Sequence, residues 1–208
     1  MENKEIDMGK VTAGITMSID GFVAGSNQRL DSPFGDIDEN ILHRWMFDNT
    51  DQPEHKDKML NYLVDAGAFI MGSNMFVPKE KYDDPEWKGW WGDNPPYHAP
   101  VFVLSEKPRE SIPMEGGTIF HFVTDGIEAA YEQAKKAAGD RKIHIAGGAN
   151  TVNQYLAAGI IDEFWLHIAP TTIGNGARLF EGVPNLKLKP IELSGTELAT
   201  HVRYEVLK

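Results

Sequence analysis

Residues 142–156 read KIHIAGGANTVNQYL, and this segment decides the fold that we expect for the chain. The β-branched Ile143 and Ile145 favour a buried strand that runs directly into the pair Gly147-Gly148. After the glycines, apolar residues recur at the three- and four-residue spacing of a helix. The segment therefore predicts a strand, a sharp glycine turn and a helix over 150–158, whose first N–H groups and positive dipole end face the turn.

A glycine pair followed by a helix is compatible with two interpretations. The free N–H groups can bind a phosphate, which is a common use of a helix N-terminus. Alternatively, the pair is only a tight turn between a strand and a helix. The spacing is not that of the G-x-G-x-x-G dinucleotide fingerprint, so the segment alone leaves both interpretations open.

The composition limits the classes of function. We expect one domain over residues 10–208 after a polar, flexible leader over residues 1–9, and a cytoplasmic protein without a signal peptide or membrane span. The chain has no cysteine, and its seven histidines lack metal-ligand spacing, so we expect no metal site. A net charge of −11 argues against a nucleic-acid or anionic-membrane surface. A small phosphate-bearing ligand stays possible, because backbone amides can bind it.

Strand-like and helical segments alternate from residue 68 to residue 168, which predicts an α/β fold with a central, mostly parallel sheet. Two helical stripes, over 37–46 and 59–64, precede this region. Alternating segments at 186–189 and 200–206 predict an antiparallel C-terminal hairpin with one buried face, with Ser194-Gly195 in its connection.

Several predicted strands end in residues suited to ligand binding. The strand 68–72 closes on Gly72, and Ser73 or Asn74 can cap the next helix or meet an anion. Ser105 and Thr124 follow two further strands. Because ligands of such sheets bind beyond the carboxyl ends of the strands, the sequence predicts a site where these ends converge.

The segment 78–100 is long and rich in proline and tryptophan, and such loops in compact domains are usually functional. Its aromatic side chains suit a wall or lid for a planar heterocycle, or they cover a core edge or a subunit interface. Lys107 and Arg109, a local positive cluster after the next strand, can meet a phosphate or form a solvated turn.

Taken together, the chain resembles the dihydrofolate reductase-like superfamily, and within it the reductase domain of the bifunctional riboflavin-biosynthesis deaminase-reductase. The resemblance runs from Val11 to the C-terminus. The matching segments are 18–24 (SIDGFVA), 70–73 (IMGS), 103–105 (VLS), 145–150 (IAGGAN) and 159–180. It implies a three-layer fold with helices on both faces of the sheet.

The resemblance also implies an activity, namely an NADPH-dependent reductase that transfers hydride to a small heterocyclic or ribosyl substrate. The implied type is 5-amino-6-(5-phosphoribosylamino)uracil reductase, acting without the deaminase half. Alternatives are a reductase of another pterin- or pyrimidine-like compound, a non-catalytic nucleotide-binding protein, or an interaction module on the same fold. Relatives in the family pair, so the resemblance implies a homodimer.

The implied site residues fall into five groups. The pyrophosphate of NADPH would lie on Gly147, Gly148, Ala149, Asn150 and Thr151. The second phosphate-contacting corner would be Gly72, Ser73 and Asn74. The adenosine 2′-phosphate would lie near Ser105 and Lys107. The nicotinamide would be flanked by Ile15, Thr16, Val23 and Ala24. The substrate pocket would contain Phe22, Trp90, Trp91 and Leu166.

The sequence departs from dihydrofolate reductases at several positions. Ser73 and Met75 stand where those enzymes carry Arg and Thr, and Leu166 replaces a substrate-orienting Thr, so dihydrofolate reduction is not expected. The proton-donor carboxylate has the counterparts Asp36, Asp38 and Glu39. Asp20, at the end of the first strand, is the catalytic carboxylate that we would test first. Its alternative interpretation is that Asp20-Gly21 is simply a turn.

Overall fold

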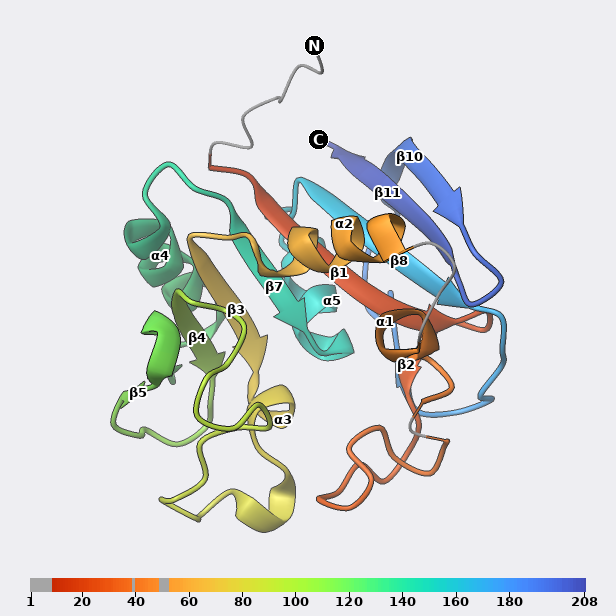
Figure 1. Ribbon diagram of the computed structural model, residues 1–208. Helices are drawn as coiled ribbons and strands as arrows, with labels where there is room; N and C mark the ends of the chain where they lie inside the picture. The colour runs from red at the N-terminus through yellow and green to blue at the C-terminus, as the bar shows by residue number, and fades with distance from the viewer. Residues whose placement is uncertain (1–8, 39, 49–52) are drawn as a thin grey trace.

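The computed structural model describes residues 9–38, 40–48 and 53–208, and the expected leader over 1–9 lies outside them apart from Gly9. Within these residues a nine-stranded mixed sheet runs through the molecule (Figure 1). Its strands are β1 Val11–Ser18, β3 Ala68–Gly72, β4 Pro100–Leu104, β5 Ile112–Pro113, β6 Ile119–Val123, β7 Ile143–Gly147, β8 Glu163–Ala169, β10 Lys187–Gly195 and β11 Thr200–Leu207. The strands β2 Phe22–Ala24 and β9 Ala177–Arg178 form a separate antiparallel pair.

The order across the sheet is β10-β11-β8-β1-β7-β3-β4-β6-β5. The six strands from β8 to β6 run parallel to one another, and β10 and β11 form an antiparallel hairpin beside β8. The predicted sheet, mostly parallel with an antiparallel hairpin at one edge, is confirmed. The parallel strands therefore share one carboxyl edge, the edge at which their arrows end in Figure 1.

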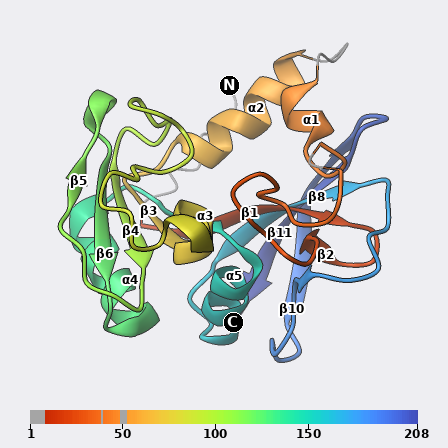
Figure 2. The ribbon, with the colours of Figure 1, turned by 90° about the horizontal axis from the view of Figure 1, so that it is seen from below.

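Helices cover both faces of the sheet, which confirms the expected three layers. They are α1 Arg44–Phe47, α2 Pro53–Val64, α3 Ser73–Phe76, α4 Gly126–Ala138 and α5 Ala149–Ala157, with short 3₁₀ turns η1 Lys79–Lys81 and η2 Glu115–Gly117. Figure 2 shows α1 and α2 on one side of the sheet and α4 and α5 on the other. The short α3 lies at the carboxyl edge between them.

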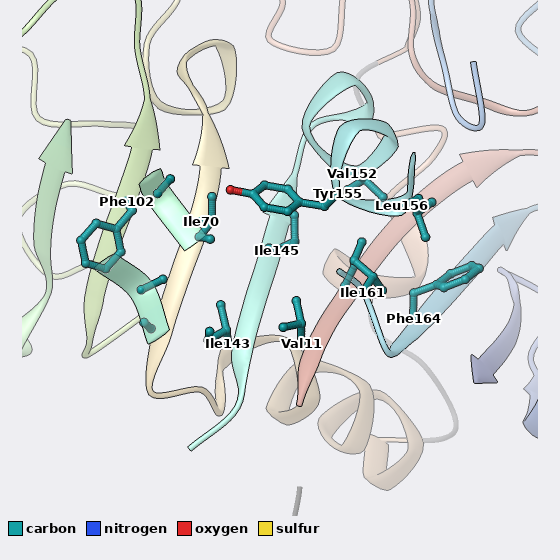
Figure 3. Close-up of a cluster of buried hydrophobic side chains, with 14 of the residues drawn as sticks. Val11, Ile70, Phe102, Ile143, Ile145, Val152, Tyr155, Leu156, Ile161 and Phe164 are labelled. Atoms are coloured by element: carbon teal, nitrogen blue, oxygen red, sulfur yellow. The ribbon is translucent and has the colours of Figure 1, made fainter. Parts of the chain in front are cut away.

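The largest hydrophobic cluster lies between the sheet and α4 and α5 (Figure 3). Val152, Tyr155 and Leu156, the residues whose spacing predicted the helix, are each at most 2% exposed. The Tyr155 hydroxyl donates a hydrogen bond of 2.8 Å to the carbonyl of Ile127, next to the start of α4. Burial raises the pKa of this phenol. The apolar stripe of α5 thus fixes the helix on β7, which aims its N-terminus at the carboxyl edge.

A predicted helix over 37–46 is wrong for most of its length, because α1 is the only helix among the described residues of this stretch. The backbone N–H of Asn40 donates to the Asp38 side chain at 3.0 Å, and the N–H of Ile41 donates to the Asp38 carbonyl at 3.0 Å. Such local bonds from an aspartate compete with helix formation. The following helix starts earlier than the stripe 59–64 suggests, at Pro53, since proline suits the first helical position.

The C-terminal hairpin also differs from its prediction in two respects. Ser194-Gly195 belongs to β10. The connection between the two strands begins at Thr196, whose N–H donates a hydrogen bond of 2.9 Å to the carbonyl of Ala199. The buried residues lie on β11, such as His201 and Val202, whereas β10 is largely exposed. The physical reason is position, because β10 is an edge strand and only β11 is enclosed between two strands.

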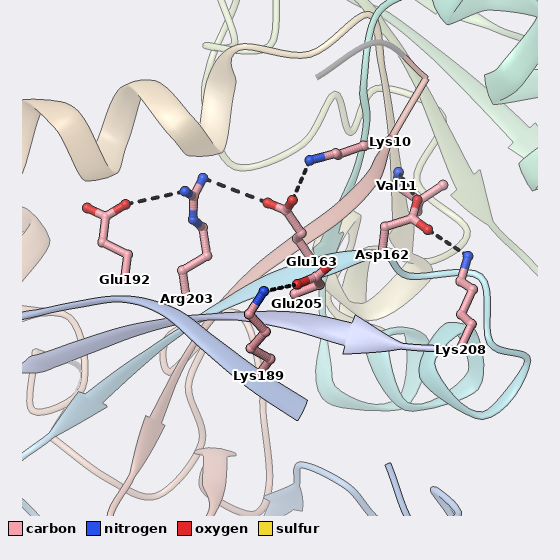
Figure 4. Close-up of polar contacts among 9 residues, drawn as sticks. All are labelled: Lys10, Val11, Asp162, Glu163, Lys189, Glu192, Arg203, Glu205 and Lys208. Atoms are coloured by element: carbon pink, nitrogen blue, oxygen red, sulfur yellow. Dashed lines mark hydrogen bonds and ion pairs between the residues drawn. The ribbon is translucent and has the colours of Figure 1, made fainter. Parts of the chain in front are cut away.

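Ion pairs connect the first strand to the last ones at the edge opposite the site (Figure 4). The buried carboxylate of Glu163 accepts a hydrogen bond of 2.5 Å from Lys10 and lies 3.7 Å from the Arg203 guanidinium. Asp162 accepts the N–H of Val11 at 2.9 Å and the ammonium of Lys208 at 2.6 Å. These contacts fix β1 between its neighbours at its amino end.

Candidate functional site

The glycine pair lies at the carboxyl edge, where β7 passes into α5. Gly147 has φ of +127°, a conformation available to glycine but strained for other residues, and the Gly147-Gly148 peptide is cis. Gly148 is the N-cap of α5 and no side chain caps the helix. The first helical hydrogen bond of α5 is donated by the N–H of Val152 to the Gly148 carbonyl at 3.1 Å. The preceding amides of α5 therefore have no partner within the helix.

The corner at Gly72 packs against the first turn of α5. A Cβ atom added at Gly72 would come within 2.6 Å of the Thr151 hydroxyl oxygen, and one added at Gly147 would lie 3.4 Å from the Met75 sulfur. Thr151 is buried. The glycines thus let two strand-to-helix corners touch, and the residues predicted for the pyrophosphate come together with Gly72 and its neighbours.

Ser105 and Lys107 lie at the carboxyl end of β4, as expected from the sequence. The Ser105 hydroxyl donates to the Lys107 carbonyl at 2.8 Å. The Lys107 ammonium donates to Asp83 at 2.5 Å and lies 4.9 Å from the centre of the Tyr82 ring, and Asp83 raises the pKa of this lysine. The Lys107 side chain is 59% exposed, so this ion pair is accessible to a competing anion.

Arg109 does not form a free anion site. Its guanidinium donates to the carbonyls of Pro85 and Trp87 at 2.8 and 2.6 Å and stacks near the rings of Phe76 and Phe122. Together with Lys107 it ties the long aromatic segment to the end of the sheet. The two cations thus have a structural use that the sequence analysis did not include.

A pocket of about 340 Å³ opens beyond the carboxyl edge, within the range of about 300 to 1,000 Å³ typical of small-molecule sites. It is lined by Gly25, Ser26, Asn27, Gln28, Arg29, Pro33, Asn74, Pro78, Lys79, Trp90, Gly176 and Ala177. Of the predicted site residues, Asn74 and Trp90 line it. Val23 and Ala24, both buried in β2, lead directly into its wall at Gly25.

The loop 25–36 forms much of this wall and was missed as a site element. Its ends are joined by the N–H of Gly25, which donates to the Phe34 carbonyl at 2.8 Å, and the Asp36 carboxylate accepts bonds of 2.6 Å from Asn27 and Arg29. These donors lower the pKa of Asp36, the Asn27 amide first. The signal that could have found the loop is its length, since long polar loops beside a sheet edge are often functional.

The remaining predicted pocket residues lie outside the pocket lining. Trp91 is 51% exposed and is not among the residues that line the pocket. Phe22 is buried beneath the Arg178 guanidinium, 4.4 Å from the ring centre, and Leu166 is buried in the main core opposite Ile15 of β1.

Two predicted residues of β1 lie on opposite faces of that strand. The hydroxyl of Thr16 accepts a hydrogen bond of 3.1 Å from the indole of Trp45 and is covered by α1. Ile15 packs against the core cluster on the other face. Neither residue is among those that line the pocket.

Trp90 is held in the pocket wall by its neighbours. Its ring meets the Trp87 ring edge-on, with centroids 5.1 Å apart at 82°. The Trp87 indole N–H donates to the Phe76 carbonyl at 2.8 Å, which fixes the pair on the end of α3. The aromatic segment therefore presents a supported tryptophan to the pocket.

Asp20 holds the loop after β8 to the end of β1. Its carboxylate accepts bonds from the Ser18 hydroxyl at 2.5 Å and from the backbone N–H groups of Ile173 and Gly174 at 3.2 and 2.7 Å. The Ser18 hydroxyl, followed by these amides, lowers the pKa of Asp20. The turn at Asp20-Gly21 is present, with the N–H of Gly21 bonded to the Ser18 carbonyl at 3.0 Å. An ionised carboxylate with three donors suits loop positioning better than proton donation.

The pH dependence of stability checks this assignment. Because the pKa of Asp20 is lower in the folded chain, its stabilisation is present above the unfolded value of about 4 and disappears as the pH falls through the folded value. We expect Asp20→Asn to lower the melting temperature at pH 7, with a difference from the parent that shrinks below about pH 4. Asp140→Asn, a change at an exposed position, is the control. A melting-temperature difference for Asp20→Asn that is constant from pH 7 to pH 3 would contradict the assignment.

The described part of the chain forms neither a metal-binding cluster nor a membrane-spanning helix. No three or more of its His, Asp and Glu side chains are grouped so as to hold a metal ion. None of its helices has the length and apolar character needed to span a bilayer.

A mostly parallel sheet with an antiparallel C-terminal hairpin, helices on both faces and a pocket at the carboxyl edge defines the dihydrofolate reductase-like reductase fold. The chain belongs to the family of the RibD C-terminal domain, whose model matches residues 9–200. This family consists of reductase-like domains and indicates an oxidoreductase that acts on a small molecule.

Individual relatives agree with this placement. The uncharacterized protein YyaP of Bacillus subtilis (strain 168) is 24% identical over 182 residues, which are 86% of each chain. A pyrimidine reductase-like protein from Corynebacterium diphtheriae NCTC superposes with a TM-score of 0.57 at 18% identity, covering 96% of this chain and 92% of the other. The diaminohydroxyphosphoribosylaminopyrimidine deaminase/5-amino-6-(5-phosphoribosylamino)uracil reductase of Thermotoga maritima gives 0.59 at 13% identity, covering 97% of this chain and 57% of the other. At such identities the two structures support the fold alone.

Proposed function

We propose that the protein is an NADPH-dependent reductase that transfers hydride to a small heterocyclic or ribosyl substrate. The type that we favour is 5-amino-6-(5-phosphoribosylamino)uracil reductase, the activity that the Thermotoga maritima relative carries in its name. The observation that supports the proposal most directly is the contact between the two glycine corners at the carboxyl edge. There the uncapped start of α5 offers backbone N–H groups beside Gly72.

The residues of this corner fit a dinucleotide. The positive φ of Gly147 and the space that a Cβ at Gly72 would fill leave bare backbone, to which a pyrophosphate can come close. In this proposal Gly147 to Thr151 bind the pyrophosphate, with Ser73 and Asn74 on its other side. Lys107 would exchange part of its ion pair with Asp83 for the adenosine 2′-phosphate. When bound, NADPH supplies the hydride.

The chain's own residues would orient the reactants. Val23 and Ala24 lead from the core into the pocket wall at Gly25, where we place the nicotinamide end. Asp20 would hold the loop that carries Gly176 on the opposite wall. The residues that line the pocket, all of them described, include no carboxylate. We therefore propose that solvent, rather than a side chain, supplies the proton to the substrate. Of the three candidate carboxylates Asp36, Asp38 and Glu39, the last lies outside the described residues.

The test has a binding arm and a turnover arm. NADPH at 100 times its Kd should stabilise the folded protein by about 2.7 kcal/mol, seen as a rise in melting temperature. Loss of NADPH absorbance is then followed with pyrimidine, pterin and dihydrofolate substrates, and the pyrimidine class should be consumed. No thermal shift with millimolar NADPH or NADH would overturn the proposal. A thermal shift without oxidation of NADPH would instead support the non-catalytic nucleotide-binding alternative.

We further propose a cytoplasmic homodimer. The supporting observation is the edge strand β10, which has no neighbouring strand on one side among the described residues and carries Leu193 at 71% exposure. An exposed edge of this kind can pair with a second chain. Light scattering of the purified protein distinguishes a dimer from a monomer.

A further inference from the structure

Asn153 is a buried polar residue of α5 whose side chain faces the loop after β8. It is 6% exposed and lies in the middle of the helix that starts at the glycine corner. Its amide nitrogen donates a hydrogen bond of 3.0 Å to the Arg178 carbonyl, and its amide oxygen accepts one of 2.7 Å from the Phe180 N–H. A buried carboxamide with both ends bonded to one short segment fixes that segment on the helix.

The segment 177–180 is held from its other side by β2. Its strand β9 pairs with β2 in antiparallel direction, and the N–H of Leu179 donates to the Gly21 carbonyl at 2.9 Å. In an extended chain the polar groups of successive residues point to alternate sides. The Asn153 carboxamide therefore bonds the side that faces away from β2, where it acts in place of a further strand.

The bond to Phe180 secures an uncommon backbone conformation. Phe180 has φ of +65°, a region that bulky residues rarely adopt. Such a conformation persists where its surroundings hold it. The Phe180 N–H is held by Asn153, and its ring packs against the main core. Without the carboxamide the chain can leave this conformation, so the position of the segment depends on Asn153.

The held segment leads directly from the pocket wall. Gly176 and Ala177 line the pocket and immediately precede the two backbone groups that Asn153 bonds. At the other end of the same loop, the Asp20 carboxylate accepts the N–H of Gly174 at 2.7 Å. The wall thus lies between two anchors, one at the end of β1 and the other on α5.

The anchor on α5 follows directly on the turn that we assign to the pyrophosphate. The first helical hydrogen bond of α5 comes from Val152, so the amides before it have no partner within the helix. A helix of nine residues has little stability by itself, and its first turn is prone to fraying. An anion that accepts the free amides suppresses the fraying. A firmer first turn holds the Asn153 carboxamide, and with it the loop, more firmly.

We propose that Asn153 is a positioning residue that couples the α5 corner to the pocket, so that a dinucleotide bound at α5 orders the loop 173–180. The inference rests on the proposed function, because it takes NADPH as the molecule at this corner. Asn153 does not line the pocket and acts through Gly176 and Ala177. Cofactor binding then prepares the pocket wall, and by reciprocity a substrate held by this wall strengthens NADPH binding.

Amide hydrogen exchange measures this coupling without requiring turnover. In the parent protein, saturating NADPH should slow the exchange of residues 149–152, and that of residues 173–180 by about tenfold. Asn153→Leu removes both bonds at similar volume and adds no charge. In this variant residues 173–180 should exchange about tenfold faster without NADPH, NADPH should no longer slow them, and exchange in β7 should stay unchanged. Gln154→Leu, the matched control at an exposed neighbour, should behave like the parent.

Asn153→Asp is the conservative variant. Its carboxylate still accepts the Phe180 N–H but cannot donate to the Arg178 carbonyl, so the loss of protection should be intermediate. It also keeps the test decisive if Asn153→Leu does not fold. With saturating NADPH both variants should raise the KM for the pyrimidine substrate about tenfold. The Kd of NADPH, measured without substrate, should stay within about threefold of the parent value for Asn153→Leu.

Three results would overturn the inference and leave the reductase proposal standing. They are unchanged exchange of residues 173–180 in Asn153→Leu, an equal rise in β7 that indicates a general loss of stability, and NADPH protection of the loop that survives in this variant. A parent protein that binds no NADPH overturns the reductase proposal and with it the coupling. The exchange of the unliganded variants then still decides whether Asn153 holds the pocket wall.

Discussion

Asn150→Asp should weaken NADPH binding by about 10- to 100-fold and yet leave the protein as stable as before or slightly more so. Asn150 is exposed in the first turn of α5, beside the amides to which we assign the pyrophosphate. A carboxylate there repels a phosphate. The same carboxylate interacts favourably with the positive end of the helix dipole, which contributes about 0.3 to 1 kcal/mol to stability. Because the substitution should lower NADPH affinity while preserving or raising stability, a general loss of structure cannot explain the result. NADPH titration measures the affinity and thermal unfolding measures the stability.

Gln154→Glu is the matched control for this prediction. Gln154 is exposed on the same helix, one turn further from the glycine corner, so the substitution adds the same charge away from the first amides. We expect it to change the NADPH affinity by less than about threefold, because the effect of the helix terminus is confined to its first turn. Equal losses of affinity in the two variants would show that overall charge, rather than the α5 corner, governs binding.

Gly176→Ala should lower the free energy of unfolding by about 3 kcal/mol and deform the pocket. Gly176 has φ of +130°, and a Cβ atom there would lie 2.0 Å from the Ala24 carbonyl oxygen. Backbone cannot yield as a flexible side chain can, so the loop must move away from β2. Because Gly176 lines the pocket, turnover of the pyrimidine substrate should fall together with stability.

Gly174→Ala separates the steric effect from backbone strain. Gly174 lies in the same loop with φ of +85°, but an added Cβ would meet no atom within 4 Å. We therefore expect a cost of only about 1 to 2 kcal/mol, the penalty of the left-handed conformation. Equal destabilisation of the two variants in urea unfolding would show that the contact with Ala24 does not matter.

Much of the fold could be predicted because its pattern is local. Ile143 and Ile145 ahead of two glycines, and Val152 and Tyr155 after them, have spacings that only a strand and a helix satisfy, and the structure has both. The parallel direction of β3, β4, β6 and β7 was predicted from the alternation of elements. Because parallel strands end at the same edge, the convergence of Gly72, Gly147 and Ser105 there was also predictable. It depends on the topology of the sheet and not on the side chains.

The site was less predictable because its contacts are distant in sequence. The Asp20 carboxylate meets amides of Ile173 and Gly174, more than 150 residues away, and nothing near Asp20 indicates these partners. Lys107 and Arg109 tie down the aromatic segment through contacts that their position after a strand does not reveal. The place of the loop 25–36 in the pocket wall depends on its approach to Gly176, which is distant in sequence.

The central position of β1 determines when the chain can fold during synthesis. This strand is translated before the other strands of the sheet, yet it lies between β7 and β8, and the hydrogen bond from the Thr12 hydroxyl to the Ile143 carbonyl spans 131 residues. Neither edge of β1 can pair until the ribosome has passed the middle of the chain. Glu163, which accepts a hydrogen bond from Lys10 and forms an ion pair with Arg203, is synthesised later still. Long-range parallel pairing of this kind is slow and leaves an unpaired apolar strand in the nascent chain. The central strand β1 is therefore the strand that stays longest without its pairing partners during synthesis.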